Sequence, residues 1–128
     1  MKRATGIGGI FFKSENPELL QAWYIRHLGL EPGSGGFVTF QWPQGQTEAK
    51  PGSTVWAPFP KDTTSFEPGR KEFMINFRVH NLDELLKALL SEGVEVDPRR
   101  DDSEYGKFAW IMDPEGNSVE LWEPPPGK

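Results

Sequence analysis

The chain has 128 residues, a net charge of −5, and 36% hydrophobic and 26% charged residues. This length and hydrophobic content predict one folded domain and exclude a disordered chain, and the negative charge argues against a nucleic-acid binder, which needs a basic face. There is no cysteine, so we expect neither disulfides nor thiolate metal sites. No apolar run approaches the length of a signal peptide or a membrane span, so we expect a cytoplasmic protein without membrane contact.

The first predicted elements are a strand and a helix. Ile10 and Phe12 alternate with other residues at the period of a strand. Asn16 is a good N-cap and Pro17 suits the first helical position, where its missing N–H costs nothing. Gly29 then stands where a glycine commonly ends a helix. The apolar side of this helix is expected to comprise Leu19, Leu20, Trp23 and Leu28.

Three short strands are predicted next, at residues 30–31, 37–42 and 53–59. Residues 44–52 form a loose loop between the last two of these strands. Residues 60–71 are polar and contain the pair Pro68-Gly69, which is typical of a linker.

The second half repeats this order. Strand periodicity at residues 75–79 is followed by Asn81 as an N-cap and by Gly93 as a helix stop. Strands are predicted at 94–96, 107–112 and 118–122, with a tight turn at 113–117 between the last two. The pair Arg99-Arg100, followed at once by two acids, indicates a solvated loop. The helix has an apolar stripe of Leu82, Leu85, Leu86 and Leu89.

The two halves align with each other at a shift of 65 residues. This shift places Ile10 on Ile75, Phe12 on Phe77 and Asn16 on Asn81. A shift of about half the chain indicates duplication of one unit. We therefore predict an α+β fold of two tandem βαβββ modules, whose curved mixed sheets surround a cleft. Module one covers about residues 5–59, the linker about 60–71 and module two about 72–125.

The sequence resembles the vicinal oxygen chelate superfamily, which includes glyoxalase I, extradiol dioxygenases and bleomycin resistance proteins. The resembling stretches are NPELLQAWYIRHLGL at 16–30, FRVHNLDELLKALLSEGVEV at 77–96 and DPEGNSVELWEPP at 113–125. The resemblance implies the glyoxalase/bleomycin resistance fold and, in many members, a homodimer.

Catalytic members of that superfamily hold a divalent metal on the first and last strands of each module. The resemblance places these four positions on Gly9, Met74, either Val55 or Trp56, and Glu120. Only Glu120 is a ligand type, and one carboxylate does not retain a divalent metal in an open catalytic site. The two histidines, at positions 27 and 80, lie on a helix and at a strand end, away from Glu120. We therefore predict no metal and no cofactor.

Strand alternation predicts which side chains line the cleft. Glu120 is the candidate catalytic residue. Glu120 and the candidate ligand-binding residues also have a purely structural interpretation. In that interpretation Glu120 pairs with Arg78 or Lys13, Asn76 satisfies a backbone group, and the tryptophans belong to the core or to a dimer surface. The candidate ligand-binding residues are Phe11, Lys13, Trp56, Met74, Asn76, Arg78, Tyr105 and Trp122.

Four functions fit these residues. The first is a metal-free small-molecule-binding protein of the bleomycin-resistance type, with an aromatic cleft suited to a planar or cationic ligand. The second is a metal-independent lyase or isomerase with Glu120 as general base, Asn76 and Arg78 stabilising an enolate oxygen. The third is a metal enzyme whose ligands lie elsewhere in the sequence, and the fourth is a structural subunit without a ligand. The residues favour the first, as a homodimer.

Overall fold

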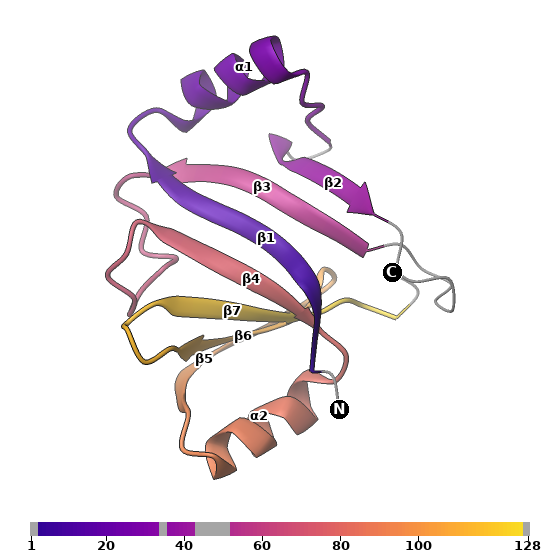
Figure 1. Ribbon diagram of the computed structural model, residues 1–128, viewed down its shortest axis with the longest axis vertical. Coiled ribbons are helices and arrows are strands. Elements are labelled where there is room, and N and C mark those ends of the chain that lie inside the picture. Colours follow the sequence, from indigo (N-terminus) through magenta and orange to yellow (C-terminus); the bar gives the residue numbers. More distant parts are fainter. Residues whose placement is uncertain (1–2, 34–35, 43–51, 127–128) are drawn as a thin grey trace.

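The computed structural model describes residues 3–33, 36–42 and 52–126 (Figure 1). These residues form one curved, open seven-stranded sheet and two helices. The α+β class and the curvature of the sheet are as the sequence predicts, whereas the eighth predicted strand is missing from the described residues. No helix in these residues is long and apolar enough to cross a membrane. The elements in chain order are β1 (Ala4–Ser14), α1 (Pro17–Leu28), β2 (Val38–Trp42), β3 (Gly52–Pro60), β4 (Phe73–Val79), α2 (Leu82–Ser91), β5 (Glu95–Ser103), β6 (Gly106–Met112) and β7 (Ser118–Glu123).

The sheet has the strand order β2-β3-β1-β4-β7-β6-β5, so the two halves join side by side at β1 and β4. Within each half the first strand runs parallel to the last, β1 to β3 and β4 to β7. The strands β1 and β4 are antiparallel, and Ile10 lies opposite Ile75. These two residues are also counterparts in the sequence repeat, so the halves are related by an approximate twofold axis that passes between them.

Both helices begin at the predicted caps. The side chains of Asn16 and Asn81 accept hydrogen bonds from the backbone N–H groups of Leu19 and Glu84, at 3.1 Å each. Gly29 ends α1 with a φ of 71°, a left-handed conformation that glycine adopts without a steric cost. The stop and start signals in the sequence are therefore confirmed.

The face of the sheet that carries the helices, here called the helix face, has an apolar core under α2. Leu82 is fully buried, and Val79, Ala109 and Leu121 complete the cluster. The predicted leucine stripe of α2 packs against it. Figure 1 shows that α2 lies over the β4–β7 half of the sheet and α1 over the other half.

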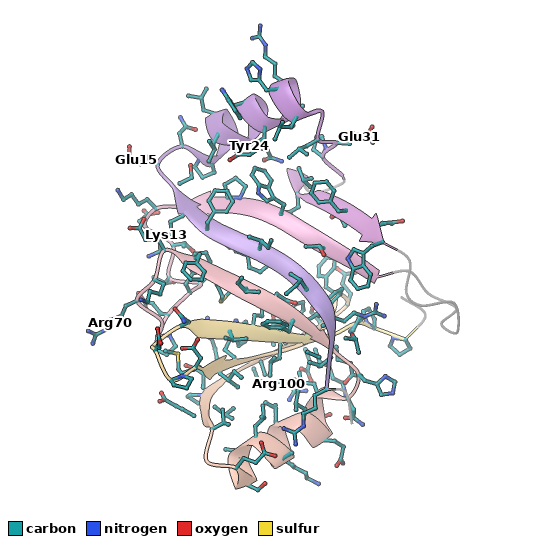
Figure 2. The ribbon with its side chains drawn as sticks, in the orientation of Figure 1. Lys13, Glu15, Tyr24, Glu31, Arg70 and Arg100 are labelled. Carbon is teal, nitrogen blue, oxygen red and sulfur yellow. The ribbon has the colours of Figure 1, made fainter. Side chains whose placement is uncertain are left out.

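Helix α1 packs differently from the prediction. Leu19 and Trp23 are 69% and 53% exposed, and no residue of α1 is fully buried. The helix contacts the sheet through Tyr24, whose ring lies 4.6 Å from that of Trp56 (Figure 2). Two adjacent stripes on this helix are apolar, and the periodicity alone does not decide which of them meets the sheet.

The opposite face, here called the concave face, has a second core to which the linker contributes. Phe66, in the connection between β3 and β4 (residues 61–72), is 1% exposed and packs with Met74 and Trp110. Its ring lies 5.3 Å from the ring of Phe59. The sequence predicts a polar linker here and gives no sign that Phe66 belongs to the core.

Two other predictions of local structure need correction. Residues 30–31 form no strand, and only an isolated bridge joins Pro32 to Val38, so the described part of module one is βαββ. Arg99 and Arg100 lie in β5 rather than in a solvated loop, because β5 extends to Ser103 and pairs with β6. Of the loop predicted at 44–52, residues 44–51 lie outside the described residues, and Gly52 begins β3.

The buried position of Phe66 generates a stability prediction. Phe66→Ala should lower the free energy of unfolding by about 3–5 kcal/mol, since it removes a buried ring and leaves a cavity between two strands and the connection. Urea unfolding followed by far-UV circular dichroism measures this loss. Phe73→Ala is the control, because Phe73 is 45% exposed and its loss should be clearly smaller. Equal losses of unfolding free energy in the two variants would contradict the burial of Phe66 in the core.

Candidate functional site

The candidate site is centred on Glu120, on the concave face of β7. The carboxylate is largely buried, and each of its oxygens accepts one hydrogen bond. Asn76 Nδ2 on β4 donates to Oε1 at 2.6 Å, and Trp110 Nε1 on β6 donates to Oε2 at 3.0 Å. Both donors come from strands adjacent to β7, because Asn76 and Trp110 are the register partners of Glu120 on its two sides.

Burial raises the pKa of Glu120 above its ordinary value of 4.5, because removal from water penalises the charged carboxylate. The hydrogen bonds from Asn76 and Trp110 act in the opposite direction, as does the positive charge of Arg99, while the nearby charge of Asp101 adds to the increase. The net direction is upward because desolvation is the largest of these effects. A carboxyl group with a raised pKa holds its proton more tightly than an ordinary one and is a stronger base once it is ionised.

Arg99 connects this carboxylate to the β3–β4 connection. Its guanidinium lies 4.0 Å from the centre of the Trp110 ring, on the face of the indole. Its Nη1 and Nη2 donate to the backbone carbonyls of Ser65 (3.3 Å) and Glu67 (2.8 Å). These two carbonyls flank Phe66, so one side chain holds both the indole and the segment that covers it.

Several predicted site residues lie on the concave face. Met74 and Phe11 belong to the apolar cluster around Phe66. Lys13 lies at the edge of the face, with its ammonium 5.9 Å from the centre of the Phe66 ring. Arg78 lies opposite Trp122 in the register of β4 and β7, and the Trp122 ring stacks on Phe108 with centroids 6.3 Å apart.

Two predicted residues lie elsewhere. Trp56 faces α1, where it packs on Tyr24 and Phe12, so its prediction as a ligand-binding residue of the cleft is wrong. Tyr105 is 69% exposed in the turn between β5 and β6, and only its backbone carbonyl takes part, as the acceptor of the Trp122 indole N–H at 2.8 Å. Neither side chain lines the concave face.

The register also corrects the counterpart of Glu120 in module one. Glu120 pairs with Asn76, and Ala57 pairs with Phe11, which is the repeat counterpart of Asn76. The equivalent position is therefore Ala57, rather than Val55 or Trp56. The two halves share one scaffold, but only the second half places polar side chains at its centre.

This donor set does not fit a divalent metal. The four superfamily positions are Gly9, Met74, Ala57 and Glu120, and they supply one carboxylate, whose two oxygens already accept N–H groups. Within the described ranges, no three His, Cys, Asp or Glu side chains gather where they could hold a metal ion. Divalent metals in proteins need several such ligands. No chemical step is therefore derived through a metal.

The sequence reasoning missed Trp110, Arg99 and Phe66. Trp110 carried a signal, because it lies in the predicted strand 107–112, which the tight turn at 113–117 pairs with the strand of Glu120. Arg99 and Phe66 carried none, since a basic pair beside acids and a single aromatic in a polar linker are usual surface features.

The concave face is strongly curved, and a depression of about 770 Å³ lies at its edge. β1 and β5 are separated by three strands in the sheet, yet Lys13 from β1 and Arg99 from β5 line the same depression. The connection contributes Thr64, Glu67 and Arg70 to its lining. Glu120 is not among the lining residues.

The fold agrees with the comparison to known families. The sequence matches the glyoxalase-like domain family over residues 9–122. The chain belongs to this family. The match covers both modules and confirms the superfamily resemblance that the sequence motifs indicate. No curated protein matches the chain.

Solved structures of glyoxalase-like proteins share the fold at low sequence identity. Methylmalonyl-CoA epimerase from Mycobacterium tuberculosis is 17% identical, with a TM-score of 0.63 over 98% of this chain and 92% of that protein. A variant of the Streptomyces coelicolor epimerase in complex with 2-nitronate-propionyl-CoA is 15% identical, with a TM-score of 0.70 over 94% and 98%. A glyoxalase/bleomycin resistance protein/dioxygenase superfamily member from Vibrio splendidus 12B01 is 12% identical, with a TM-score of 0.59 over 91% and 97%.

The raised pKa of Glu120 generates a prediction about stability and pH. The folded state binds this proton more tightly than the unfolded state, so the stability contribution is present below pH 4.5 and is lost as the pH rises through the raised pKa. Glu120→Gln stays neutral and lacks this loss. The free energy of unfolding of the variant relative to the wild type should therefore increase as the pH rises above 4.5.

Urea unfolding at several pH values from about 4 to about 8 measures this difference. Glu95→Gln, an exposed change of the same kind on β5, should give a much flatter difference. A difference for Glu120→Gln that stays constant or falls with pH would contradict the raised pKa.

Proposed function

We propose that this chain binds a small organic molecule on the concave face of its sheet, against Glu120. The observation that carries this proposal is the largely buried carboxylate held by Asn76 and Trp110 among apolar and aromatic side chains. A mainly apolar, curved surface with a few fixed polar groups is the usual composition of a small-molecule site.

The aromatic residues of this face support a flat or cationic ligand. Trp122 and Phe108 stack on each other with an interplanar angle of 18°, and the indole N–H of Trp122 is fixed by the carbonyl of Tyr105. Both rings lie on the side of β6 and β7 that carries Trp110 and Glu120. A ring that is held in place loses little conformational freedom when a ligand stacks on it.

Two buried polar atoms on β4 and β7, the strands of Asn76 and Glu120, support a specialised site. Asn76 Oδ1 and Ser118 Oγ have no hydrogen-bond partner among the described residues, and Asn76 is only 3% exposed. The backbone of Gly8 approaches Asn76 Oδ1 so closely that a Cβ at this position would clash with it. An unpaired buried polar group costs stability, and such costs concentrate at functional sites.

The binding proposal predicts different effects for two tryptophans. A thermal-shift screen of planar aromatic compounds and 2-oxo acids should identify a ligand, and Trp122→Leu should weaken its affinity about tenfold by removal of the stacking surface. Trp56→Leu is the control, because Trp56 faces α1. Calorimetric titration of both variants measures the dissociation constants, and an unchanged affinity in Trp122→Leu would remove the concave face as the ligand site.

A second candidate is proton transfer by Glu120 in a metal-independent lyase or isomerase, which its raised pKa favours. A carboxylate oxygen would take a proton from a carbon next to a substrate carbonyl, and the C–H electron pair would move to the carbonyl oxygen as an enolate. Asn76 directs its amide at Glu120, so we assign it to hold the base. Arg78, on the same face of β4, would stabilise the enolate. The structures of methylmalonyl-CoA epimerase share this fold.

Exchange of substrate hydrogen with solvent tests this second candidate. Incubation of 2-oxo and 2-hydroxy acids in D2O should produce deuterium incorporation, detected by NMR, and Glu120→Gln should slow it by about a hundredfold or more. Glu95→Gln should retain the wild-type rate. Incorporation that survives Glu120→Gln would exclude Glu120 as the base.

The homodimer and the cytoplasmic location stay predictions. The described surface has exposed apolar side chains that a second copy would cover, on the outer side of α1 and at the centre of the helix face between the two helices. They are Ile7, Ile10, Leu19, Trp23, Leu28 and Phe73.

A further inference from the structure

Arg99 makes an unusual number of specific contacts for a half-buried arginine at the edge of a sheet. It stacks on Trp110, donates to two carbonyls of the β3–β4 connection, and lies 3.7 Å from Asp97 Oδ1 through its Nε. The neighbouring Arg100 instead faces α2, where it pairs with Asp83 at 3.0 Å. The two arginines of one basic pair therefore serve opposite faces of the sheet.

An irregularity in β5 places Arg99 over the indole. Between the pairs Val96–Ile111 and Arg100–Ala109, β5 advances four residues while β6 advances two. Asp97 Oδ1 accepts the backbone N–H of Arg99 at 2.8 Å within this bulge, which replaces the missing ladder bond. Bulges of this kind redirect side chains and are frequent beside functional sites.

The contacts of Arg99 form a continuous path from the connection to Glu120. The guanidinium fixes the carbonyls on either side of Phe66 and covers one face of Trp110, while the edge of the same indole donates to Glu120 Oε2. A cation over the ring draws electron density from the indole and makes its N–H a stronger donor, since neighbouring polar interactions strengthen one another.

We propose that Arg99 is a positioning residue. It orients Trp110 so that the indole N–H donates to the Glu120 carboxylate, and it couples this hydrogen bond to the packing of the 61–72 connection on the sheet. The inference rests on the proposed role of Glu120 for its functional meaning, and on the contacts above for its geometry. Arginine suits this role because its planar fork donates to two carbonyls while its face stacks on an indole. Lysine would supply the charge without the fork.

NMR of the ligand-free protein tests the proposal. In Arg99→Gln the Nε1–H resonance of Trp110 should shift and its exchange with solvent should accelerate at least tenfold. The amides of Glu67 and Gly69, which close turns within the connection, should lose protection by a similar factor. Arg99→Lys keeps the positive charge but not the two donors to the carbonyls. It should therefore preserve the shift and exchange rate of the Trp110 Nε1–H better than the protection of the Glu67 and Gly69 amides.

Arg70→Gln is the matched control, because Arg70 lines the same depression but projects from the connection into solvent (Figure 2). It should leave both readouts unchanged. A Trp110 resonance that stays in place in Arg99→Gln while the amides open would show a structural clamp only and would overturn the proposal. Equal effects from Arg70→Gln would do the same.

Trp110→Phe tests the path from its other end if Arg99→Gln does not fold. The phenyl ring keeps a platform for Arg99 but has no N–H, so the connection amides should stay protected while the carboxyl carbon resonance of Glu120 moves. An unmoved Glu120 resonance would refute the link. These readouts need no ligand, so they are independent of the outcome of the ligand screen.

Discussion

The antiparallel pairing of β1 with β4 is the constraint on which the rest of the structure depends. It joins two duplicated halves at an approximate twofold axis between Ile10 and Ile75, and it makes one continuous sheet with both helices on one face. The opposite face must then curve around its own side chains. Because the first and last strands of each half are parallel neighbours, the last strand of module two brings Glu120 beside Asn76, near the centre of that face.

The two halves use this common scaffold in different ways. At corresponding positions, module two has Glu120 and Asn76, whereas module one has Ala57 and Phe11. The polar pair is thus surrounded by apolar groups supplied by the other half and by Phe66 from the connection. Such surroundings remove water from the carboxylate, which explains why desolvation outweighs the two hydrogen bonds in setting its pKa. A site of this kind does not supply the several ligands that a divalent metal needs.

Local sequence patterns predicted the elements and failed where contacts distant in the chain decided the outcome. The N-caps at Asn16 and Asn81, the leucine stripe of α2 and the placement of Asn76 and Glu120 on one face all follow from spacing within a few residues. The position of Trp56 was wrong because the strand register in module one was uncertain by one residue, and a shift of one residue moves a side chain to the other face of the sheet. Phe66 lies in a polar stretch, where composition predicts solvent exposure.

The sequence by itself determined the duplication, the α+β class, the family and the single retained carboxylate, because these depend on residue identity and periodicity along the chain. Only the tertiary structure decided the surroundings of that carboxylate. The Trp110 hydrogen bond needs the β6–β7 register, and Arg99 reaches the indole through a bulge in β5. Phe66 is buried only because Met74 and Trp110, from two strands distant in the sequence, meet it on the concave face. The physical reason is that burial and hydrogen-bond geometry arise between residues far apart in sequence, whose approach no local pattern encodes.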